Sequence, residues 1–329
     1  MKKRIFVLYT GGTIGMCHSE HGLCPDTALV HQALTPFDAQ YHFDWWVCEP
    51  LIDSSAVTPA DWQQWLTLLA DKIPQYDGVL VLHGTDTLAY TANILALALQ
   101  GVNKPIVLTG SQLPYNAAQS DAPFNLATAV ASFELSDWVG VAIAFHGKLF
   151  PAVGSSKVST ETVEGFANTH FGAWAQWSAE QGWHHQNQPA ATHQNSAWQV
   201  LPLNPLAQVA CFYLTPSVSI AYLAQQIRTC PLPSMILQTY GHGNAPSQTV
   251  LMDSIRAYIQ RGGLVLNISQ VVQGCAAAVY AQGNALREAG VMNGGKCNIE
   301  TANALLTLAT SQPDACTYVQ TQLQQWHLI

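Results

Sequence analysis

The sequence has 329 residues, of which 49% are apolar and only 10% are Asp, Glu, Lys or Arg; an average soluble domain carries about 25% charged residues. Its 12 basic and 20 acidic residues give a formal net charge of −8, which excludes a general nucleic-acid binder because such proteins carry clustered basic residues in excess. No apolar run approaches the roughly 18 residues that a membrane span needs, and the composition excludes a disordered chain. The length predicts two domains of about 150 residues, and the low charge suggests that an oligomer covers part of the surface.

The first residues begin like a signal peptide, because Lys2, Lys3 and Arg4 precede the apolar run 5–9. That run is short, two glycines follow it, and no small-residue cleavage site comes after it, so we interpret it as the first strand of a mature, cytoplasmic protein. The eight cysteines are scattered without a CxxC pair. In a chain of this length, that pattern predicts reduced thiols rather than a disulfide framework.

Short apolar runs that read as buried strands alternate with helical patterns along the chain. Their continuous apolar character is typical of a parallel sheet covered on both faces, and the alternation predicts a doubly wound α/β fold. We expect a larger N-terminal domain with a mostly parallel sheet over 1–185, a linker rich in Gln, Asn, His and Pro over 186–206, and a smaller C-terminal α/β domain over 207–329. The predicted strands are 5–9, 79–83, 106–109, 139–145, 235–239 and 264–268.

Three helices can be bounded from sequence signals. Thr58 is expected to cap the first helix, because a proline and an acidic residue follow it in the first turn. A second helix is expected to begin near Thr85 and Asp86. A third covers about 251–260 and ends at the glycine pair 262–263, since glycine is the preferred residue just past a helix end.

The first predicted strand ends in the segment TGGTIG, residues 10–15. Glycines here allow a sharp turn and the close approach of a ligand. The segment departs from the dinucleotide pattern GxGxxG, because Thr10 takes the place of the first glycine, and no GK[ST] of a phosphate loop follows. Two interpretations stay open: a plain turn, or a hydroxyl nucleophile, Thr13, at the carboxyl end of a strand, where doubly wound folds bind ligands.

The segment HGTDT, residues 83–87, follows the predicted strand 79–83. Thr85 and Asp86 could form an ordinary helix cap with an acidic first turn. The same geometry would also let free backbone N–H groups hold an anion or a developing oxyanion. The Asp86 carboxylate could then hold a substrate ammonium group, and the Thr85 hydroxyl could act as a nucleophile beside a base. We interpret His83 as a hydrogen-bonded structural residue.

Lys157, which follows two serines, is a candidate for that base, although only a neutral amine can accept a proton; the alternative is a solvated surface lysine. The Asp53-Ser54-Ser55 segment is either ordinary turn chemistry or a set of contacts for a small carboxylate. Three histidines within 184–193 lack a carboxylate or cysteine partner at metal spacing, so we expect no metal site.

The order of these segments resembles that of the bacterial-type L-asparaginase family, most closely its type I, cytoplasmic branch. The resemblance covers nearly the whole chain and is weakest over 170–206, and two threonine motifs in this order and at this separation are highly specific. The matching segments are TGGTIG at 10–15, DSS at 53–55, HGTDT at 83–87, TGSQ at 109–112, Ser-Ser-Lys at 155–157 and YGHGNAP at 240–246.

The resemblance implies a homodimer or homotetramer whose active site lies at the carboxyl ends of N-terminal strands, near a neighbouring subunit. The implied reaction is hydrolysis of the side-chain amide of L-asparagine to L-aspartate and ammonia, with no cofactor, no nucleic-acid partner and no membrane. By motif position, Thr13 attacks the amide and forms an acyl-enzyme, and Thr85, Asp86 and Lys157 form a second catalytic group. Substrate contacts are implied for Gly12, Asp53, Ser54, Ser55, Gly84, Asp86 and Asn244.

Within that set, the resemblance implies that Asp86 pairs with the substrate ammonium, Ser54 binds its α-carboxylate, and Asn244 comes from the neighbouring subunit. Amide hydrolysis needs a nucleophile, a base and donors aimed at the tetrahedral oxyanion, and these residue types supply that set. The sequence leaves open which threonine forms the covalent bond. We favour Thr13, because it lies on a glycine-rich loop and has no role as a helix cap.

Three positions depart from the family pattern, one of which is Ala56, where an aspartate is common after the serine pair. Type I members usually carry a tyrosine shortly after the first threonine loop, in a Gly-Tyr-x-Pro context, where this chain has Leu23; the change bears on catalytic efficiency and on how the loop closes. An allosteric cysteine can follow the strand that matches 264–268, where this chain reads Ser269-Gln270-Val271. We therefore predict weak or no cooperativity toward asparagine.

Three alternatives stay open: a glutaminase-asparaginase of broader specificity, the asparaginase-like subunit of a tRNA-dependent amidotransferase, and a non-catalytic amino-acid sensor. Glutamine is longer than asparagine by one methylene, and a pocket separates such substrates only about 10- to 200-fold. The amidotransferase subunit usually carries a further N-terminal domain, and the acidic balance disfavours a tRNA partner. A sensor would bind the amino acid without releasing ammonia.

Overall fold

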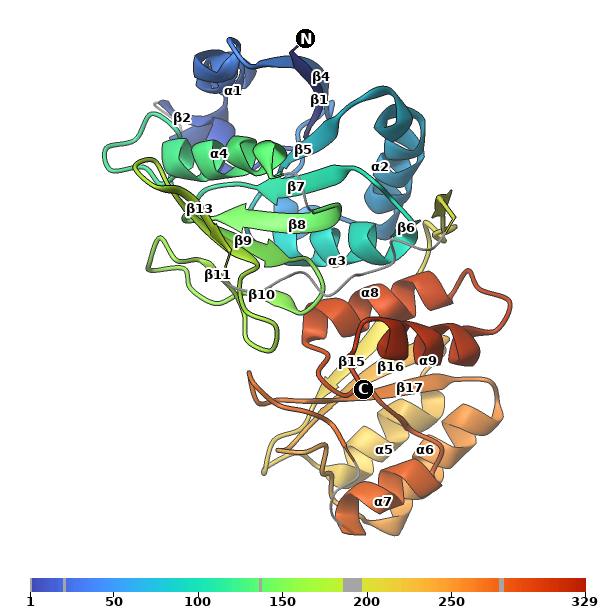
Figure 1. Cartoon of the computed structure of the whole chain (residues 1–329). Coiled ribbons are helices and arrows are strands. Elements are labelled where there is room, and N and C mark those ends of the chain that lie inside the picture. The colour runs from blue at the N-terminus through green and yellow to red at the C-terminus, as the bar shows by residue number, and fades with distance from the viewer. Residues whose placement is uncertain (1, 20–21, 136–137, 186–196, 278–280) are drawn as a thin grey trace. The chain divides into compact units, whose positions relative to one another are not determined.

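The computed structural model describes residues 2–19, 22–135, 138–185, 197–277 and 281–329. The chain divides into two compact units, Met1–Leu201 and Pro202–Ile329 (Figure 1), and each has its own apolar core. The division falls inside the predicted linker 186–206, of which residues 186–196 lie outside the described residues. The domain limits 1–185 and 207–329 stay predictions.

An eight-stranded sheet forms the centre of the first unit, in the order β13-β12-β9-β8-β7-β5-β1-β4. The strands from β8 to β4 run parallel, and β9, β12 and β13 extend the sheet in antiparallel pairs. The central strands are apolar runs buried on both faces, as a covered parallel sheet requires. The strands are β1 (Lys3–Tyr9), β4 (Tyr41–Val47), β5 (Gly78–Leu82), β7 (Pro105–Thr109), β8 (Gly140–Phe145), β9 (Lys148–Pro151), β12 (Ala175–Ser178) and β13 (Gly182–His185).

Helices lie on both faces of this sheet (Figure 1). Val30 and Leu34 of α1 and Leu126 of α4 join one apolar cluster with inward-facing residues of β1 and β5. On the other face, α3 contacts β7 and β8 and packs against α2. This is the doubly wound arrangement predicted from the sequence. The helices are α1 (Thr27–Leu34), α2 (Pro59–Lys72), α3 (Leu88–Ala98) and α4 (Ala122–Ala131).

Three short antiparallel pairs complete the described part of the first unit. The hairpin of β2 and β3 directly follows the short 3-10 helix Thr13–Gly15, and the pair of β10 and β11 carries Lys157. A third pair joins the residues after α3 to the end of the unit. The pairs are β2 (Met16–Ser19) with β3 (Gly22–Pro25), β6 (Leu99–Gln100) with β14 (Gln199–Val200), and β10 (Ser155–Lys157) with β11 (Phe166–Asn168).

The second unit is built around a smaller, fully parallel sheet in the order β15-β16-β17-β18. Helices α5 and α6 share an apolar core with this sheet, and α8 contacts β15, β16 and β17. The strands are β15 (Val209–Tyr213), β16 (Ser234–Thr239), β17 (Leu264–Ser269) and β18 (Met292–Asn293). The helices are α5 (Ile220–Thr229), α6 (Thr249–Gln260), α7 (Ala281–Glu288), α8 (Ile299–Ala309) and α9 (Ala315–Gln325).

All six strands predicted from the sequence are present, as β1, β5, β7, β8, β16 and β17. The predicted cap of α2 is confirmed, since Asp61 Oδ2 accepts from the Thr58 backbone N–H at 2.8 Å in a capping box. The third helix, α6, begins two residues before the predicted range and ends before the glycine pair. None of the helices in the described ranges is long and apolar enough to cross a membrane.

The prediction that a helix begins near Thr85 and Asp86 is wrong. Helix α3 begins at Leu88 with Thr87 as its N-cap, and residues 85–87 form a turn. The reason is that the Thr85 and Asp86 side chains bond to Lys157, whereas the Thr87 hydroxyl donates to the backbone oxygen of the loop after β4 at 2.6 Å. Thr85 and Asp86 therefore belong to a strand-to-helix turn.

Candidate active site

The loops that carry the predicted site residues meet at one edge of the eight-stranded sheet. Strands β4, β1, β5 and β7 are parallel neighbours, so the loops at their carboxyl ends emerge side by side. These loops hold Thr13 after β1, Ser54 after β4, Thr85 after β5 and Gly110 after β7. The carboxyl edge of a doubly wound sheet is where such folds bind ligands.

Glycines bring these loops into backbone contact. Gly12 has φ +100°, and a Cβ atom there would lie 2.5 Å from both Cα and N of Gly84. A Cβ atom at Gly84 would lie 2.5 Å from Ser54 Oγ, and one at Gly110 would overlap the His83 carbonyl oxygen. Only glycine permits such approaches, so the loops after β1, β4, β5 and β7 form one packed assembly.

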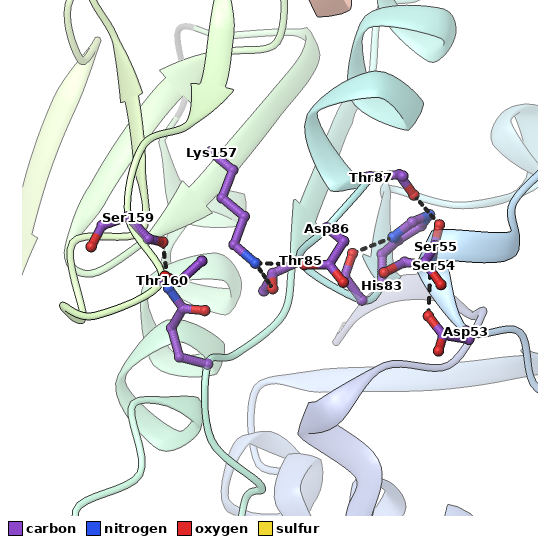
Figure 2. Close-up of polar contacts among 12 residues, drawn as sticks. Asp53, Ser54, Ser55, His83, Thr85, Asp86, Thr87, Lys157, Ser159 and Thr160 are labelled. Carbon is purple, nitrogen blue, oxygen red and sulfur yellow. Dashed lines mark hydrogen bonds and ion pairs between the residues drawn. The ribbon is translucent and has the colours of Figure 1, made fainter.

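Thr85, Asp86 and Lys157 form a hydrogen-bonded cluster at this edge (Figure 2). Lys157 Nζ donates to Thr85 Oγ1 at 2.8 Å and lies 2.7 Å from Asp86 Oδ1. Thr85 is buried and the Lys157 side chain is 17% exposed, whereas the Asp86 side chain is 61% exposed. Partial burial strengthens the charge interactions of the lysine, while the exposed carboxylate of Asp86 can meet a second cation.

A buried amide holds the strand that carries Lys157. Lys157 ends β10, opposite Phe166 of β11. The Asn168 side chain, which is 4% exposed, donates from Nδ2 to the Val153 carbonyl at 2.8 Å and to Ser155 Oγ at 3.2 Å. These hydrogen bonds of the buried Asn168 amide therefore hold the turn before β10 in place. No sequence motif marks Asn168, because its role depends on partners that lie 13 and 15 residues before it in the chain.

A chain of hydrogen bonds through His83 orients the peptide that precedes Thr85. Burial lowers the pKa of His83 to about 4, so its ring is neutral. Its Nδ1 lies 2.7 Å from the Gly84 carbonyl oxygen, and its Nε2 lies 2.9 Å from Thr91 Oγ1. Because a carbonyl only accepts, Nδ1 carries the proton and Thr91 donates to Nε2. Trp62 Nε1 in turn donates to Thr91 Oγ1 at 2.9 Å, which fixes the direction of the whole chain.

The loop after β1 is shaped by its backbone. Gly12 is the N-cap of the short helix Thr13–Gly15, and Thr13 is half-buried. None of the hydrogen bonds between described residues involves the Thr13 hydroxyl. The buried Tyr9 side chain packs under Gly15, where a Cβ atom would overlap the phenol oxygen. The Thr13 hydroxyl is therefore available to a ligand at a position set by backbone packing.

The Asp53–Ser55 turn lies on the other side of Thr85 and Asp86 from Lys157 (Figure 2). Asp53 Oδ1 accepts from the Ser55 backbone N–H at 2.9 Å, and this bond lowers the pKa of Asp53. Ser54 is buried, while Asp53 and Ser55 are exposed. The segment thus has the turn chemistry that one interpretation predicted, and it also places the Ser54 hydroxyl against the glycine that precedes Thr85.

The TGSQ segment, residues 109–112, is anchored by an aspartate that no motif marks. Asp121 is 5% exposed, and its carboxylate accepts from the backbone N–H groups of Gln112 at 2.9 Å and Leu113 at 3.0 Å. The Gln112 side chain donates from Nε2 to the Ser159 carbonyl at 2.9 Å. Through Gln112, the loop after β7 is tied to the segment that follows Lys157.

Family models match both units of the chain. The model for the N-terminal asparaginase domain matches residues 4–190, and that for the Glutaminase/Asparaginase C-terminal domain matches residues 208–323. The chain belongs to the asparaginase family. L-asparaginase 1 from Escherichia coli K12 is 34% identical over 319 residues, which cover 94% of this chain and 93% of that protein. The type I resemblance predicted from the sequence is therefore confirmed.

Solved structures of the asparaginase family share the fold. L-asparaginase I from Vibrio cholerae has a TM-score of 0.86 and 30% identity, with 98% of this chain and 97% of that chain covered. The Probable Cytoplasmic L-asparaginase from Campylobacter jejuni has a TM-score of 0.83 and 26% identity, with 98% and 99% covered. The predicted architecture, a larger N-terminal sheet domain and a smaller C-terminal α/β domain, is confirmed.

Three further positions of the asparaginase-family pattern belong to the second unit or to the β2–β3 hairpin. Asn244 is in the second unit, where its backbone bridges Tyr240, and its place beside the first-unit loops stays a prediction. Leu23 pairs with His18 through its backbone in the β2–β3 hairpin, and its side chain lies outside the described residues. In the segment Ser269-Gln270-Val271, which has no cysteine, Ser269 donates from Oγ to the Gly241 carbonyl at 2.6 Å.

The described part of this asparaginase-family chain contains no group of three or more His, Cys, Asp or Glu residues arranged to hold a metal ion. Of the three histidines within 184–193, His193 lies outside the described residues, as does the side chain of His185. The described edge offers the hydroxyls of Thr13, Ser54 and Thr85, an exposed carboxylate and a half-buried ammonium. Such a set suits amide hydrolysis of a zwitterionic substrate.

Proposed function

We propose that this chain hydrolyses the side-chain amide of L-asparagine to L-aspartate and ammonia through a threonine nucleophile and an acyl-enzyme intermediate. One observation carries the proposal: both threonine loops converge at one sheet edge, with Gly12 packed on Gly84 and Lys157 bonded to Thr85 and Asp86. Membership of the asparaginase family supports the substrate, since the Escherichia coli and Vibrio cholerae relatives are named as L-asparaginases.

Thr13 is the proposed nucleophile. Its hydroxyl takes part in none of the hydrogen bonds between described residues, whereas the Thr85 oxygen already accepts one from Lys157. Thr13 Oγ attacks the amide carbon, the carbon–nitrogen bond breaks, and ammonia leaves after taking up a proton. Water then attacks the resulting ester and returns the Thr13 hydroxyl as L-aspartate departs.

Thr85, Lys157 and Asp86 are proposed to move protons and activate water. The Thr85 hydroxyl passes its proton to the leaving nitrogen and takes one up from the attacking hydroxyl, and the Lys157 ammonium stabilises negative charge on the Thr85 oxygen from 2.8 Å. Asp86 balances the lysine charge from 2.7 Å. The His83 chain supports this step, because it fixes the peptide plane immediately before Thr85.

The proposed substrate contacts surround these groups. The exposed Asp86 carboxylate pairs with the α-ammonium, and the Ser54 hydroxyl binds the α-carboxylate, with Asp53 and Ser55 completing the turn that presents it. Gly12 and Gly84 carry no side chain, so a small amino acid can reach the backbone N–H groups of both loops. Asn244 completes the site from a neighbouring subunit.

Ammonia release from purified protein tests the proposal, with L-asparagine and L-glutamine each titrated from micromolar to tens of millimolar. We expect a hyperbolic curve that favours asparagine, because the segment Ser269-Gln270-Val271 contains no cysteine that could serve an allosteric site. A clearly sigmoidal curve would contradict the predicted loss of cooperativity. Comparable rates with both amides would assign a glutaminase-asparaginase. If folded protein binds the amino acid but releases no ammonia, the protein is an amino-acid sensor and not an enzyme.

We also propose a cytoplasmic homodimer or homotetramer. The Campylobacter jejuni relative supports the location by its name. Large apolar side chains are exposed in the second unit, among them Tyr213 at 57%, Tyr222 at 63% and Val272 at 72%, and the burial of such side chains against a second copy would favour assembly. Sedimentation equilibrium tests the assembly, and a concentration-independent monomer would exclude it.

A further inference from the structure

The hairpin that follows the Thr13 helix carries two cysteines opposite each other. Cys17 of β2 and Cys24 of β3 are register partners, and their Sγ atoms lie 3.4 Å apart. Directly opposed residues of an antiparallel pair have Cα atoms about 4.5–5.5 Å apart, inside the range of about 4.4–6.8 Å that a disulfide needs. The two sulfurs can therefore close to the bonded distance of about 2.05 Å without a change of strand register.

We propose that Cys17 and Cys24 form a reversible dithiol–disulfide pair, a site of oxidative modification that restrains the loop carrying Thr13. Both side chains are partly exposed, so a small oxidant in solution can reach them, whereas Cys48 and Cys297 are buried. Disulfides in reducing compartments are commonly transient and redox-sensing. The two thiols thus combine the proximity and the access that such a site needs.

The chemistry balances with hydrogen peroxide as the oxidant. One thiolate attacks a peroxide oxygen, the oxygen–oxygen bond breaks, hydroxide leaves, and a sulfenic acid forms. The second sulfur then displaces hydroxide from the sulfenic sulfur, so two thiols and one peroxide give one disulfide and two waters. The hydrogen bond to Cys24, together with desolvation, raises the pKa of Cys17, which makes the reaction slow at neutral pH because the thiolate is the reactive form.

The hairpin is joined to the Thr13 helix at both of its ends. The helix Thr13–Gly15 continues into β2 at Met16, and where β3 ends the Asp26 backbone N–H donates to the Gly15 carbonyl at 2.7 Å. A covalent bond between the strands fixes the spacing of the segments that leave and re-enter this junction. A nucleophile displaced by about 1 Å can lose about a hundredfold in rate. The expected effect on turnover rests on the proposed role of Thr13.

The experiment treats the purified full-length chain with hydrogen peroxide and then with dithiothreitol. Remaining thiols are alkylated, peptides are mapped by mass spectrometry, and ammonia release is measured on the same samples. We expect the peptides of Cys17 and Cys24 to be joined, with a mass about 2 Da below the sum of the reduced pair. We expect kcat to fall about tenfold and to recover on reduction.

Three serine variants make the test specific. Cys17→Ser and Cys24→Ser each keep the basal kcat and lose the peroxide response, because neither residue belongs to the proposed catalytic groups. The matched control, Cys211→Ser, removes an exposed thiol of the second unit and keeps the full response. A Cys211→Ser protein that no longer responds would assign the effect to that thiol and overturn the proposal.

Bond formation and turnover are read separately. Peptides of Cys17 and Cys24 that stay unlinked at peroxide levels that oxidise Cys211 would overturn the modification site. A linked pair with unchanged kcat would overturn its effect on Thr13. If the reduced protein releases no ammonia but the link forms and reverses, the modification site stands and the proposed function fails.

Discussion

The two threonine loops of the candidate site hold their hydroxyls in different ways. Thr85 lies within side-chain bonds, with Lys157 on its oxygen and the His83 chain behind its peptide. Thr13 follows Gly12, whose position is set by contact with the Gly84 backbone, and its hydroxyl bonds to no other described residue. A group that relays protons needs fixed partners, whereas a nucleophile needs an unengaged oxygen at a fixed place. The contrast predicts different responses to substitution.

Removing the Thr13 hydroxyl or the Lys157 amine should give the largest loss of kcat. Thr13→Ala and Lys157→Met are each expected to lower kcat at least about a hundredfold, the low end of general acid–base contributions. Steady-state ammonia release measures the loss, and mass spectrometry of acid-quenched reactions shows which threonine carries the acyl group. Thr13→Ser, which keeps a hydroxyl, is the control and should retain most activity. A near-normal kcat in Thr13→Ala, or an acyl group found on Thr85, would reverse the assignment of the two loops.

A substitution at Gly12 tests whether contact with the Gly84 backbone holds the Thr13 loop in place. Gly12→Ala places a methyl group 2.5 Å from the Gly84 backbone at φ +100°, and we expect it to lower the free energy of unfolding by at least about 3 kcal/mol. Gly140 has nearly the same angle, φ +101°, with nothing within 4 Å of a Cβ atom. Gly140→Ala should therefore cost only about 1 kcal/mol, the strain of the angle itself. Equal losses in urea unfolding of the two variants would mean that the loop contact contributes little.

The hydrogen bonds of His83 behind the Thr85 loop predict that the free energy of unfolding depends on pH. In the folded protein the pKa of His83 is about 4, so its ring stays neutral until the pH falls to that value. Histidine in an unfolded chain has a pKa of about 6.5. The contribution of His83 is therefore complete above about pH 6.5, and the free energy of unfolding falls by up to about 1.4 kcal/mol per pH unit on the way to pH 4. Urea unfolding at pH 7, 6 and 5 measures the slope.

His83→Asn should flatten this slope, and the exposed His184→Asn should leave it unchanged. The full difference between wild type and His83→Asn amounts to about 3 kcal/mol over the window. A wild-type slope that survives His83→Asn would place the titrating group elsewhere and remove the evidence that the ring is held neutral.

What the sequence could predict follows from which signals are local. Apolar runs locate the strands, and glycine–threonine segments mark the loops at their carboxyl ends, because both patterns act within a few residues. No signal within a few residues locates the start of α3. Thr85 and Thr87 are equally good helix caps by residue type. Which of them caps α3 depends on distant residues. Lys157 bonds to Thr85 and Asp86 from 72 and 71 residues further along the chain, and Ser54 accepts from Thr87 from 33 residues before it.

The supporting residues were harder still to predict. Asp121 and Asn168 are buried polar residues without a motif, and each holds backbone groups of another loop. Their roles appear only when the fold has brought those loops together, since a buried polar side chain is informative through its partners. The residues proposed to be catalytic could be recognised in the sequence, whereas the residues that hold them in place could not.

The smallest predicted effect concerns the phenol beneath the Thr13 loop. Tyr9 is 1% exposed, its hydroxyl has no hydrogen-bond partner among the described residues, and desolvation raises its pKa to about 12. Removing an unpaired buried hydroxyl relieves a desolvation cost, so Tyr9→Phe should raise the free energy of unfolding by about 1 kcal/mol and leave kcat unchanged. Tyr258 is equally buried but donates to the Leu232 carbonyl at 2.7 Å, so Tyr258→Phe should lower stability by about 1 kcal/mol. A drop in kcat on Tyr9→Phe would show that the Thr13 loop depends on a side-chain hydroxyl after all, and the contrast between the two loops would lose its basis.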